Sequence, residues 1–131
     1  MNLELLNGLT EKVIGASFEV ANTLGVGFLE KVYERALVRE LRMQGVAVES
    51  QVALAVQYKG ESVGEFSVDL LVEKELVVEL KCAERLGAEH TAQCLNYLKA
   101  SGKGLCLLIN FQRSRLEWRR VIFAEGEGRV E

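Results

Sequence analysis

Residues 104–111, Gly-Leu-Cys-Leu-Leu-Ile-Asn-Phe, form a nearly unbroken apolar run. A strand with one face in water alternates apolar and polar side chains, whereas a strand covered on both faces stays apolar throughout. The run therefore predicts a strand that is covered on both faces, and this constrains the whole sheet to which it belongs.

Three further strands are expected upstream, joined by short turns. Residues 46–58 are β-like, and residues 59–60, Lys-Gly, are typical of a hairpin turn. Residues 73–75 turn the chain again, so that 46–58, 62–72 and 76–82 form an antiparallel meander. Alternation along 62–72 predicts that one face carries Phe66, Val68, Leu70 and Val72.

Apolar residues at helical spacing predict three helices, at about 10–24, 28–44 and 88–100. Thr10 is a candidate N-cap for the first helix. A glycine follows the expected end of each helix, as is common at helix C-termini. These signals place two helices before the meander and one after it.

The expected order of elements is ααβββαββ, with residues 117–123 as the last strand. It indicates an α/β domain of two or three layers, built on a mixed sheet flanked by helices. A length of 131 residues suggests a single domain, 1–131. Its core is expected at about 10–123, with 124–131 as a frayed tail.

The charge balance limits the class of nucleic-acid binder. Sixteen Lys and Arg residues against nineteen Asp and Glu give a net charge of −3. This argues against a strong passive binder, because such affinity comes from cations on phosphates. It is compatible with an enzyme that has a local basic rim. The candidates for that rim are Arg35, Arg39 and Arg42, or Arg113, Arg115, Arg119 and Arg120.

The cysteines and the N-terminal segment indicate the cellular compartment of the protein, the cytoplasm. Cys82, Cys94 and Cys106 are odd in number and form no Cys-x-x-Cys pair, so we interpret them as reduced, buried thiols of a cytoplasmic protein. The first residues lack the basic and apolar segments of a signal peptide. No apolar run is long enough to cross a bilayer, so no membrane partner is expected.

Charged residues interrupt two of the expected strands at mid-strand. Asp69 lies in Ser-Val-Asp-Leu-Leu-Val, and Glu79 and Lys81 lie in Val-Val-Glu-Leu-Lys. Glu79 and Lys81 share a face because they are two residues apart. A hairpin centred near Lys74 pairs Asp69 with Glu79 at about 5 Å. Carboxylates this close repel one another unless a hard dication such as Mg²⁺ binds them, and a nearby lysine can orient water or offset phosphate charge.

The alternative is a solvent-exposed strand face with a Glu–Lys pair. Polar residues on the expected helices favour a site instead, because Glu30 and Tyr33 share one helical face. Gln93 and Tyr97 share another. Each also has a structural explanation: Glu30 as a first-turn glutamate favoured by the helix dipole, and the tyrosines as core residues with bonded hydroxyls. His90, the only histidine, is interpreted as an exposed or capping residue.

Three sequence motifs resemble those of a known family. Asp69 with Glu79-Leu80-Lys81 resembles the D…(D/E)xK motif of the PD-(D/E)XK nuclease superfamily. Residues 93–97, Gln-Cys-Leu-Asn-Tyr, resemble the QxxxY motif of its RecB-like branch. Residues 27–33, Gly-Phe-Leu-Glu-Lys-Val-Tyr, resemble the signature of the GxxExxY protein family within the superfamily. The likeness runs from about residue 10 to 123.

The resemblance implies a restriction-endonuclease-like core with a metal bound at the strand hairpin. The ligands that it implies for Mg²⁺ or Mn²⁺ are Asp69, Glu79, the backbone carbonyl of Leu80, and Glu30 as an additional acidic ligand. By the same resemblance, Lys81 positions the attacking water. The residues that it implies as support for the site or the DNA backbone are Gln93, Tyr97 and Tyr33.

We therefore expect a metal-dependent nuclease that acts on DNA or another nucleic acid. The alternative is a catalytically inactive module of the same fold that binds nucleic acid or a protein partner, and the small size and acidic balance favour it. A homodimer, or a component of a larger complex whose partner supplies specificity, is the third hypothesis.

Overall fold

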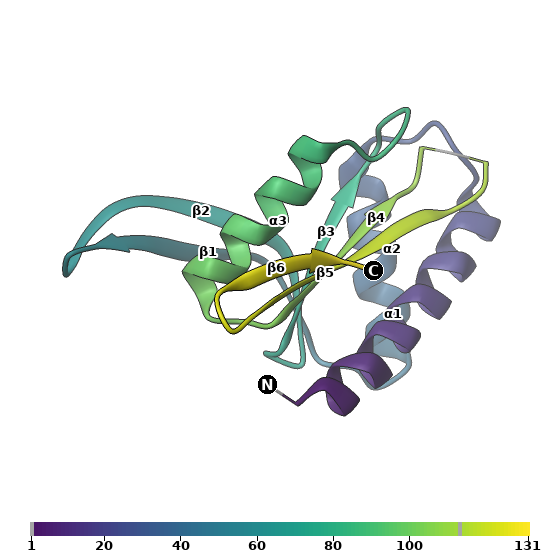
Figure 1. The fold of residues 1–131 in the computed structure, drawn as a ribbon. Coiled ribbons are helices and arrows are strands. Elements are labelled where there is room, and N and C mark those ends of the chain that lie inside the picture. Colours follow the sequence, from purple (N-terminus) through teal and green to yellow (C-terminus); the bar gives the residue numbers. More distant parts are fainter. Residues whose placement is uncertain (1, 113) are drawn as a thin grey trace.

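The chain folds into three helices and six strands over the residues that the computed structural model describes, 2–112 and 114–131 (Figure 1). The helices are α1 (Leu3–Leu24), α2 (Glu30–Met43) and α3 (Ala88–Ser101). The strands are β1 (Val48–Tyr58), β2 (Glu61–Val72), β3 (Leu76–Lys81), β4 (Leu105–Asn110), β5 (Glu117–Ala124) and β6 (Glu127–Val130). Within the described residues, none of the helices has the length and apolar character needed to cross a membrane.

The strands form one sheet in the order β1-β2-β3-β4-β5-β6. β3 and β4 are parallel and are connected through α3, whereas the other neighbouring pairs are antiparallel. Helices α1 and α2 cover one face of the sheet and α3 covers the other (Figure 1). The expected mixed α/β fold is confirmed, in its three-layer form, and it is consistent with a restriction-endonuclease-like core.

Strand β4 is the interior strand that the apolar run predicts. All of its residues are buried. Leu105, Leu107 and Ile109 belong to the core between the sheet and α1 and α2. Cys106 and Leu108 belong to the core under α3. Because both faces of β4 meet apolar layers, its side chains are apolar as far as Ile109, and its polar residue, Asn110, lies at its end.

The turn between β2 and β3 sets the register that the site needs. Glu73 and Lys74 have φ values of 51° and 60°, and two successive residues with positive φ are typical of the tight hairpin turns that match strand twist. The pairing runs through Leu70↔Val78. This register places Asp69 level with Glu79, as the sequence predicts.

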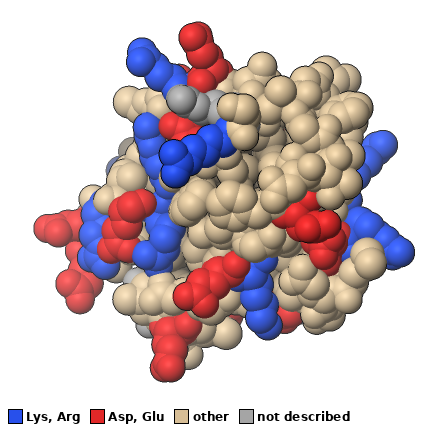
Figure 2. All heavy atoms as spheres, turned by 90° about the vertical axis from the view of Figure 1, so that its right-hand side faces the viewer, with Lys and Arg blue, Asp and Glu red and all other residues tan. Residues whose placement is uncertain are grey.

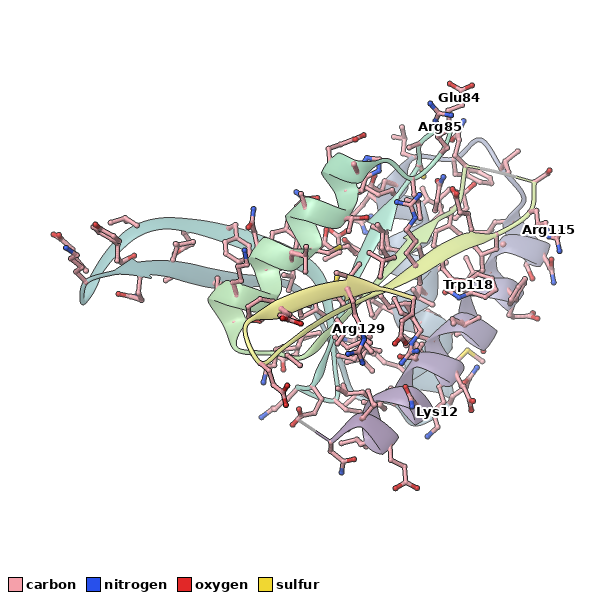
Figure 3. All side chains as sticks on the ribbon, in the orientation of Figure 1. Lys12, Glu84, Arg85, Arg115, Trp118 and Arg129 are labelled. Atoms are coloured by element: carbon pink, nitrogen blue, oxygen red, sulfur yellow. The ribbon has the colours of Figure 1, made fainter. Side chains whose placement is uncertain are left out.

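Strand β2 leaves β3 beyond Leu70. The two strands pair only as far as Leu70↔Val78, whereas β1 and β2 stay paired out to Tyr58↔Glu61. The β1–β2 hairpin therefore projects from the body as a long arm (Figures 1 and 3). We call the point of separation, between Asp69 on β2 and Glu79 on β3, the fork.

The single apolar face expected for β2 is wrong. Phe66 and Val68 pack on the α3 side of the sheet, whereas Leu70 and Val72 pack on the α1 and α2 side. Gln51 on β1, whose side chain contacts β2 at the fork, has φ of 52°, outside the strand region. The β1–β2 pairing skips Gln51 and Asp69, between Ser50↔Leu70 and Val52↔Val68. The face of β2 that meets the α3 side changes at this irregularity.

The expected start of the first helix is also wrong. α1 begins at Leu3, and its N-cap is Asn2, whose Oδ1 accepts from the N–H of Leu5 at 3.1 Å. Thr10 lies inside the helix, where its hydroxyl donates to the carbonyl of Leu6 at 2.8 Å. A threonine can bond a carbonyl four residues back as readily as it caps a helix, so its residue type alone does not mark the boundary.

The tail expected to fray forms a strand instead. Residues 127–130 are β6, which pairs antiparallel with β5. Glu125 and Gly126 turn the chain with φ values of 54° and 78°. The Arg120 side chain on β5 pairs with the carboxylate of Glu131 at 2.6 Å. Backbone pairing and this ion pair hold the tail to the sheet.

Asn110, at the end of β4, fastens the loop that follows Lys81. It is fully buried. Its Oδ1 accepts from the N–H groups of Ala83 and Gln112, both at 3.1 Å. Its Nδ2 donates to the carbonyl of Ala83 at 2.8 Å and to Glu117 Oε1 at 3.1 Å. The end of β3 is thereby tied to β4 and β5, which fixes the strand that carries Lys81.

We predict that Asn110→Ala lowers the free energy of unfolding by roughly 2–4 kcal/mol, because it leaves buried partners without hydrogen bonds. Urea denaturation measures the change. Asn96→Ala, at an exposed position of α3, is the control and should stay within about 0.5 kcal/mol of the native chain or rise slightly. Equal losses in the two variants would contradict the anchoring role of Asn110.

Candidate active site

At the fork, Asp69 and Glu79 bind the backbone of each other's strand. The N–H of Asp69 donates to Glu79 Oε1 at 2.8 Å, and the N–H of Leu80 donates to Asp69 Oδ2 at 2.8 Å. These side chains replace the ladder hydrogen bonds that end where the strands separate. Glu79 is only 3% exposed, and Asp69 is half-buried. The two carboxyl groups are thus held side by side.

Lys81 closes the site on the side of α3. Its Nζ donates to Gln93 Oε1 at 2.9 Å. In the described part of the chain, Lys81 forms no ion pair, so a neutral amide holds its ammonium group. The full positive charge therefore stays available beside Glu79, which lies two residues earlier on the same strand.

Glu30 approaches the fork from the start of α2. Partial burial raises the pKa of Glu30, and the charge of Asp69 raises it further. Lys81 and the backbone N–H of Cys82 act in the opposite direction. The Glu30 carboxyl group is therefore close enough to the fork for the charges of both Asp69 and Lys81 to affect its pKa.

Glu79 has the most displaced carboxyl group of the site. Burial first, and the charge of Asp69 second, raise the pKa of Glu79 from 4.5 to about 9. The N–H of Asp69 and the charge of Lys81 favour the ionised form but do not outweigh burial. At neutral pH Glu79 is therefore protonated unless a cation replaces the proton. Strongly displaced carboxyl groups are typical of functional sites.

Glu34 and Gln51 extend the cluster, and neither is among the site residues expected from the sequence. Glu34 is buried and accepts from Lys31 Nζ at 2.9 Å and from Gln51 Nε2 at 2.7 Å. The same Gln51 amide donates to Asp69 Oδ1 at 3.3 Å. Glu34 lies four residues after Glu30 on one helical face, which was the available signal. Gln51 offers no such signal, because a positive φ in a strand is not visible in the sequence.

The two tyrosines singled out by the sequence have different surroundings. Tyr97 stacks on Phe66 with ring centroids 4.6 Å apart. Desolvation raises its pKa, and the charges of the fork raise it further, so it borders the site. The hydroxyl of Tyr33 donates to the carbonyl of Gly25 at 2.5 Å, and its ring stacks on Phe111. Tyr33 therefore secures the connector that precedes α2.

The fit of a divalent cation rests on the chemistry of these donors. Within residues 2–112 and 114–131, no three Asp, Glu, His or Cys side chains are grouped closely enough to hold a metal ion. The oxygens of Asp69 and Glu79 are bonded to backbone N–H groups and to Gln51. Two adjacent carboxyl groups with a third acidic group nearby are nevertheless the oxygen donors that a hard dication prefers. A cation would compete with those bonds and with the proton on Glu79.

Comparison with known proteins assigns the family. The model of the PD-(D/E)XK nuclease superfamily matches residues 7–121. The chain therefore belongs to the PD-(D/E)XK nuclease superfamily and is a nuclease-fold protein. No curated protein matches the chain.

A solved structure shares the fold. "Crystal structure of SSO0001" superimposes with a TM-score of 0.57 at 15% sequence identity, over 71% of this chain and 50% of that chain. At this identity the likeness concerns the fold alone. The present chain spans about half the length of that protein.

We predict that the raised pKa of Glu79 makes the chain less stable as the pH rises. Between 4.5 and about 9 the folded state holds a proton that the unfolded state has released, so stability falls with increasing pH. Glu79→Gln keeps the neutral shape and should be the more stable form at pH 8, by roughly 1–4 kcal/mol.

Urea denaturation across this pH range measures the difference, with Glu49→Gln at an exposed β1 position as the control. The Glu49 variant should follow the native profile. Parallel profiles for the native chain and Glu79→Gln would show that Glu79 is ionised in the folded chain.

Proposed function

We propose that this chain is a metal-dependent nuclease that hydrolyses phosphodiester bonds of DNA or another nucleic acid. The proposal also places it in the GxxExxY family, on the RecB-like branch, because of the motifs that contain Glu30 and Gln93. The observation that carries it is the fork, where Asp69 and Glu79 are interlocked beside a lysine that has no carboxylate partner in the described chain. Membership of the superfamily supports the same activity.

In this proposal the cation is Mg²⁺ or Mn²⁺. A bound dication supplies an activated water and neutralises charge that develops on phosphate. The residues proposed to hold it are Asp69, Glu79, the carbonyl of Leu80, and Glu30. Lys81 orients the attacking water and places positive charge beside the phosphate. Gln93 keeps the Lys81 ammonium in position, and Tyr97 lies close enough for the charges of Glu79 and Asp69 to raise its pKa.

The proposed partner is nucleic acid, with DNA as the first choice. The proposed compartment is the cytoplasm, which the three free cysteines support. Cys94 and Cys106 are buried, and burial together with contact to Cys94 raises the pKa of Cys106. They act as apolar core residues rather than as reactive thiols.

We expect Asp69→Asn and Lys81→Ala each to lower cleavage of a labelled DNA by a factor of 100 or more, roughly the loss typical of an electrostatic catalytic group. The assay uses purified protein with MnCl₂, and gel analysis of labelled single strands and duplexes. Lys12→Ala, on the exposed surface of α1, is the matched control and should cleave like the native chain. Full activity in the Asp69 and Lys81 variants would exclude the site.

We expect Mn²⁺ affinity, measured by calorimetry, to increase between pH 6 and pH 9. The cation must displace the Glu79 proton, whose pKa is about 9, so binding releases a proton and is favoured at higher pH. Calorimetry in buffers of different ionisation enthalpy counts the proton. Glu79→Gln should remove both binding and proton release, whereas Glu49→Gln should retain both.

The second candidate function is a catalytically inactive nuclease-fold module that binds nucleic acid or a protein. It is favoured by the two carboxylate oxygens of Asp69 and by Oε1 of Glu79, which already accept hydrogen bonds from protein donors. The same calorimetry separates the two functions. An inactive module binds no Mn²⁺ in a manner that depends on Asp69, and it cleaves none of the labelled nucleic acids.

A further inference from the structure

A groove of about 450 Å³ runs along the outer side of α2, between this helix and β1. We call it the basic groove. Its cationic lining residues all come from α2 and are Lys31, Arg35, Arg39 and Arg42. The opposite wall is neutral, with Ser50 and Gln51 of β1. Glu34, on the same helix, also lines the groove, so the α2 wall combines four cations with one carboxylate.

The helix period aligns these cations. Lys31, Arg35 and Arg39 are spaced by four residues, and Arg42 follows three later, so all lie on one face of α2. From first to last they cover about 16 Å of helix. A row of positive charges of this length matches consecutive phosphates of one strand better than it matches a single small anion.

The guanidinium groups of Arg35 and Arg39 are not neutralised by the protein. In the part of the chain that the structure describes, neither arginine has a carboxylate within ion-pair distance, although the chain carries more acidic than basic residues. Arg42 donates to the carbonyl of Val48. Lys31 pairs with Glu34, whose charge is also satisfied by Gln51. In the described chain, whose net charge is −3, Arg35 and Arg39 lie together without a carboxylate partner, which points to an anionic ligand.

Two arginines of the alternative basic rim are used within the fold, whereas Arg115 is exposed. Arg119 donates to the carbonyl of Leu86 at 2.7 Å, and Arg120 pairs with Glu131. Arg113 lies outside the described residues. On the molecular face in Figure 2, Lys and Arg lie near Asp and Glu around a mostly uncharged centre. The α2 row is therefore the better candidate for binding phosphates.

One end of the basic groove borders the fork. Gln51 lines the groove, and its amide donates to both Glu34 and Asp69. Lys31 lines the same end, because it also donates to Glu34, and it follows Glu30 in the first turn of α2. A strand that lies in the groove therefore leads toward the acidic groups of the site.

We propose that the basic groove binds the sugar–phosphate backbone of the substrate strand next to the bond that is cleaved, with Arg35 and Arg39 as the main phosphate contacts. This inference rests on the proposed function. Contacts to phosphates position a strand without reading its sequence, so the groove makes binding sequence-independent and dependent on salt.

The test compares Arg35→Gln/Arg39→Gln with the control Lys12→Gln/Arg129→Gln, which removes the same charge. Lys12 on α1 and Arg129 on β6 are exposed and are labelled in Figure 3. Fluorescence anisotropy with labelled single-stranded and duplex DNA is recorded at several salt concentrations. A chelator is present, so that cleavage is prevented and binding is measured by itself.

The groove variant should bind at least ten-fold more weakly at about 0.1 M salt. The slope of log affinity against log salt should fall by about 0.7 per lost contact for single strands, or about 0.9 for duplex DNA. The control pair should keep the native affinity and slope. The strand type with the larger loss identifies the form of DNA that occupies the groove, and unchanged unfolding midpoints verify the fold.

Native affinity and slope in the groove variant, or equal losses in the control pair, would overturn the proposal. Its failure is distinct from failure of the proposed function, because Lys81→Ala tests cleavage and leaves the groove intact. A native chain that binds through the groove but cleaves nothing supports the groove and contradicts the nuclease assignment.

Discussion

The exchange of hydrogen bonds between Asp69 and Glu79 is the interaction on which the site depends. Where β2 leaves β3, the N–H groups of Asp69 and Leu80 lose strand partners, and buried amides without partners are costly. The two carboxyl groups take these amides instead. The residues proposed to act on substrate are therefore the ones that allow the arm to separate from the sheet.

The same arrangement sets the electrostatics of the site. Glu79 is only 3% exposed and lies beside the carboxyl group of Asp69. Burial first, and the charge of Asp69 second, disfavour its ionised form, so the pKa of Glu79 rises to about 9. Lys81 does not neutralise it, because its ammonium group is directed to Gln93. A proton and a dication then compete for the carboxyl groups of Asp69 and Glu79. The cations of the basic groove on α2 add a neighbouring surface that suits phosphates.

Much of the fold could be predicted, because it follows from local patterns. The apolar run at 105–109 required cover on both faces, and the turn at Glu73 and Lys74 set the β2–β3 register. The prediction failed at a local irregularity of the β1–β2 pairing. Gln51 has a positive φ, lies where the faces of the arm change, and carries the amide that joins Glu34 to Asp69. β6 was missed because its short, exposed segment has no apolar alternation.

The sequence by itself determined the order of elements as far as β5, the mixed α/β class and the pairing of Asp69 with Glu79, since periodicity and turn chemistry are local properties of the chain. Only the tertiary structure decided where β2 parts from β3, which tyrosine borders the site, and that α2 supplies Glu34 and a row of unpaired arginines. These features depend on which side chains meet across elements distant in sequence. Burial and neighbouring charge, which displace the Glu79 carboxyl group, exist only after those elements have packed together.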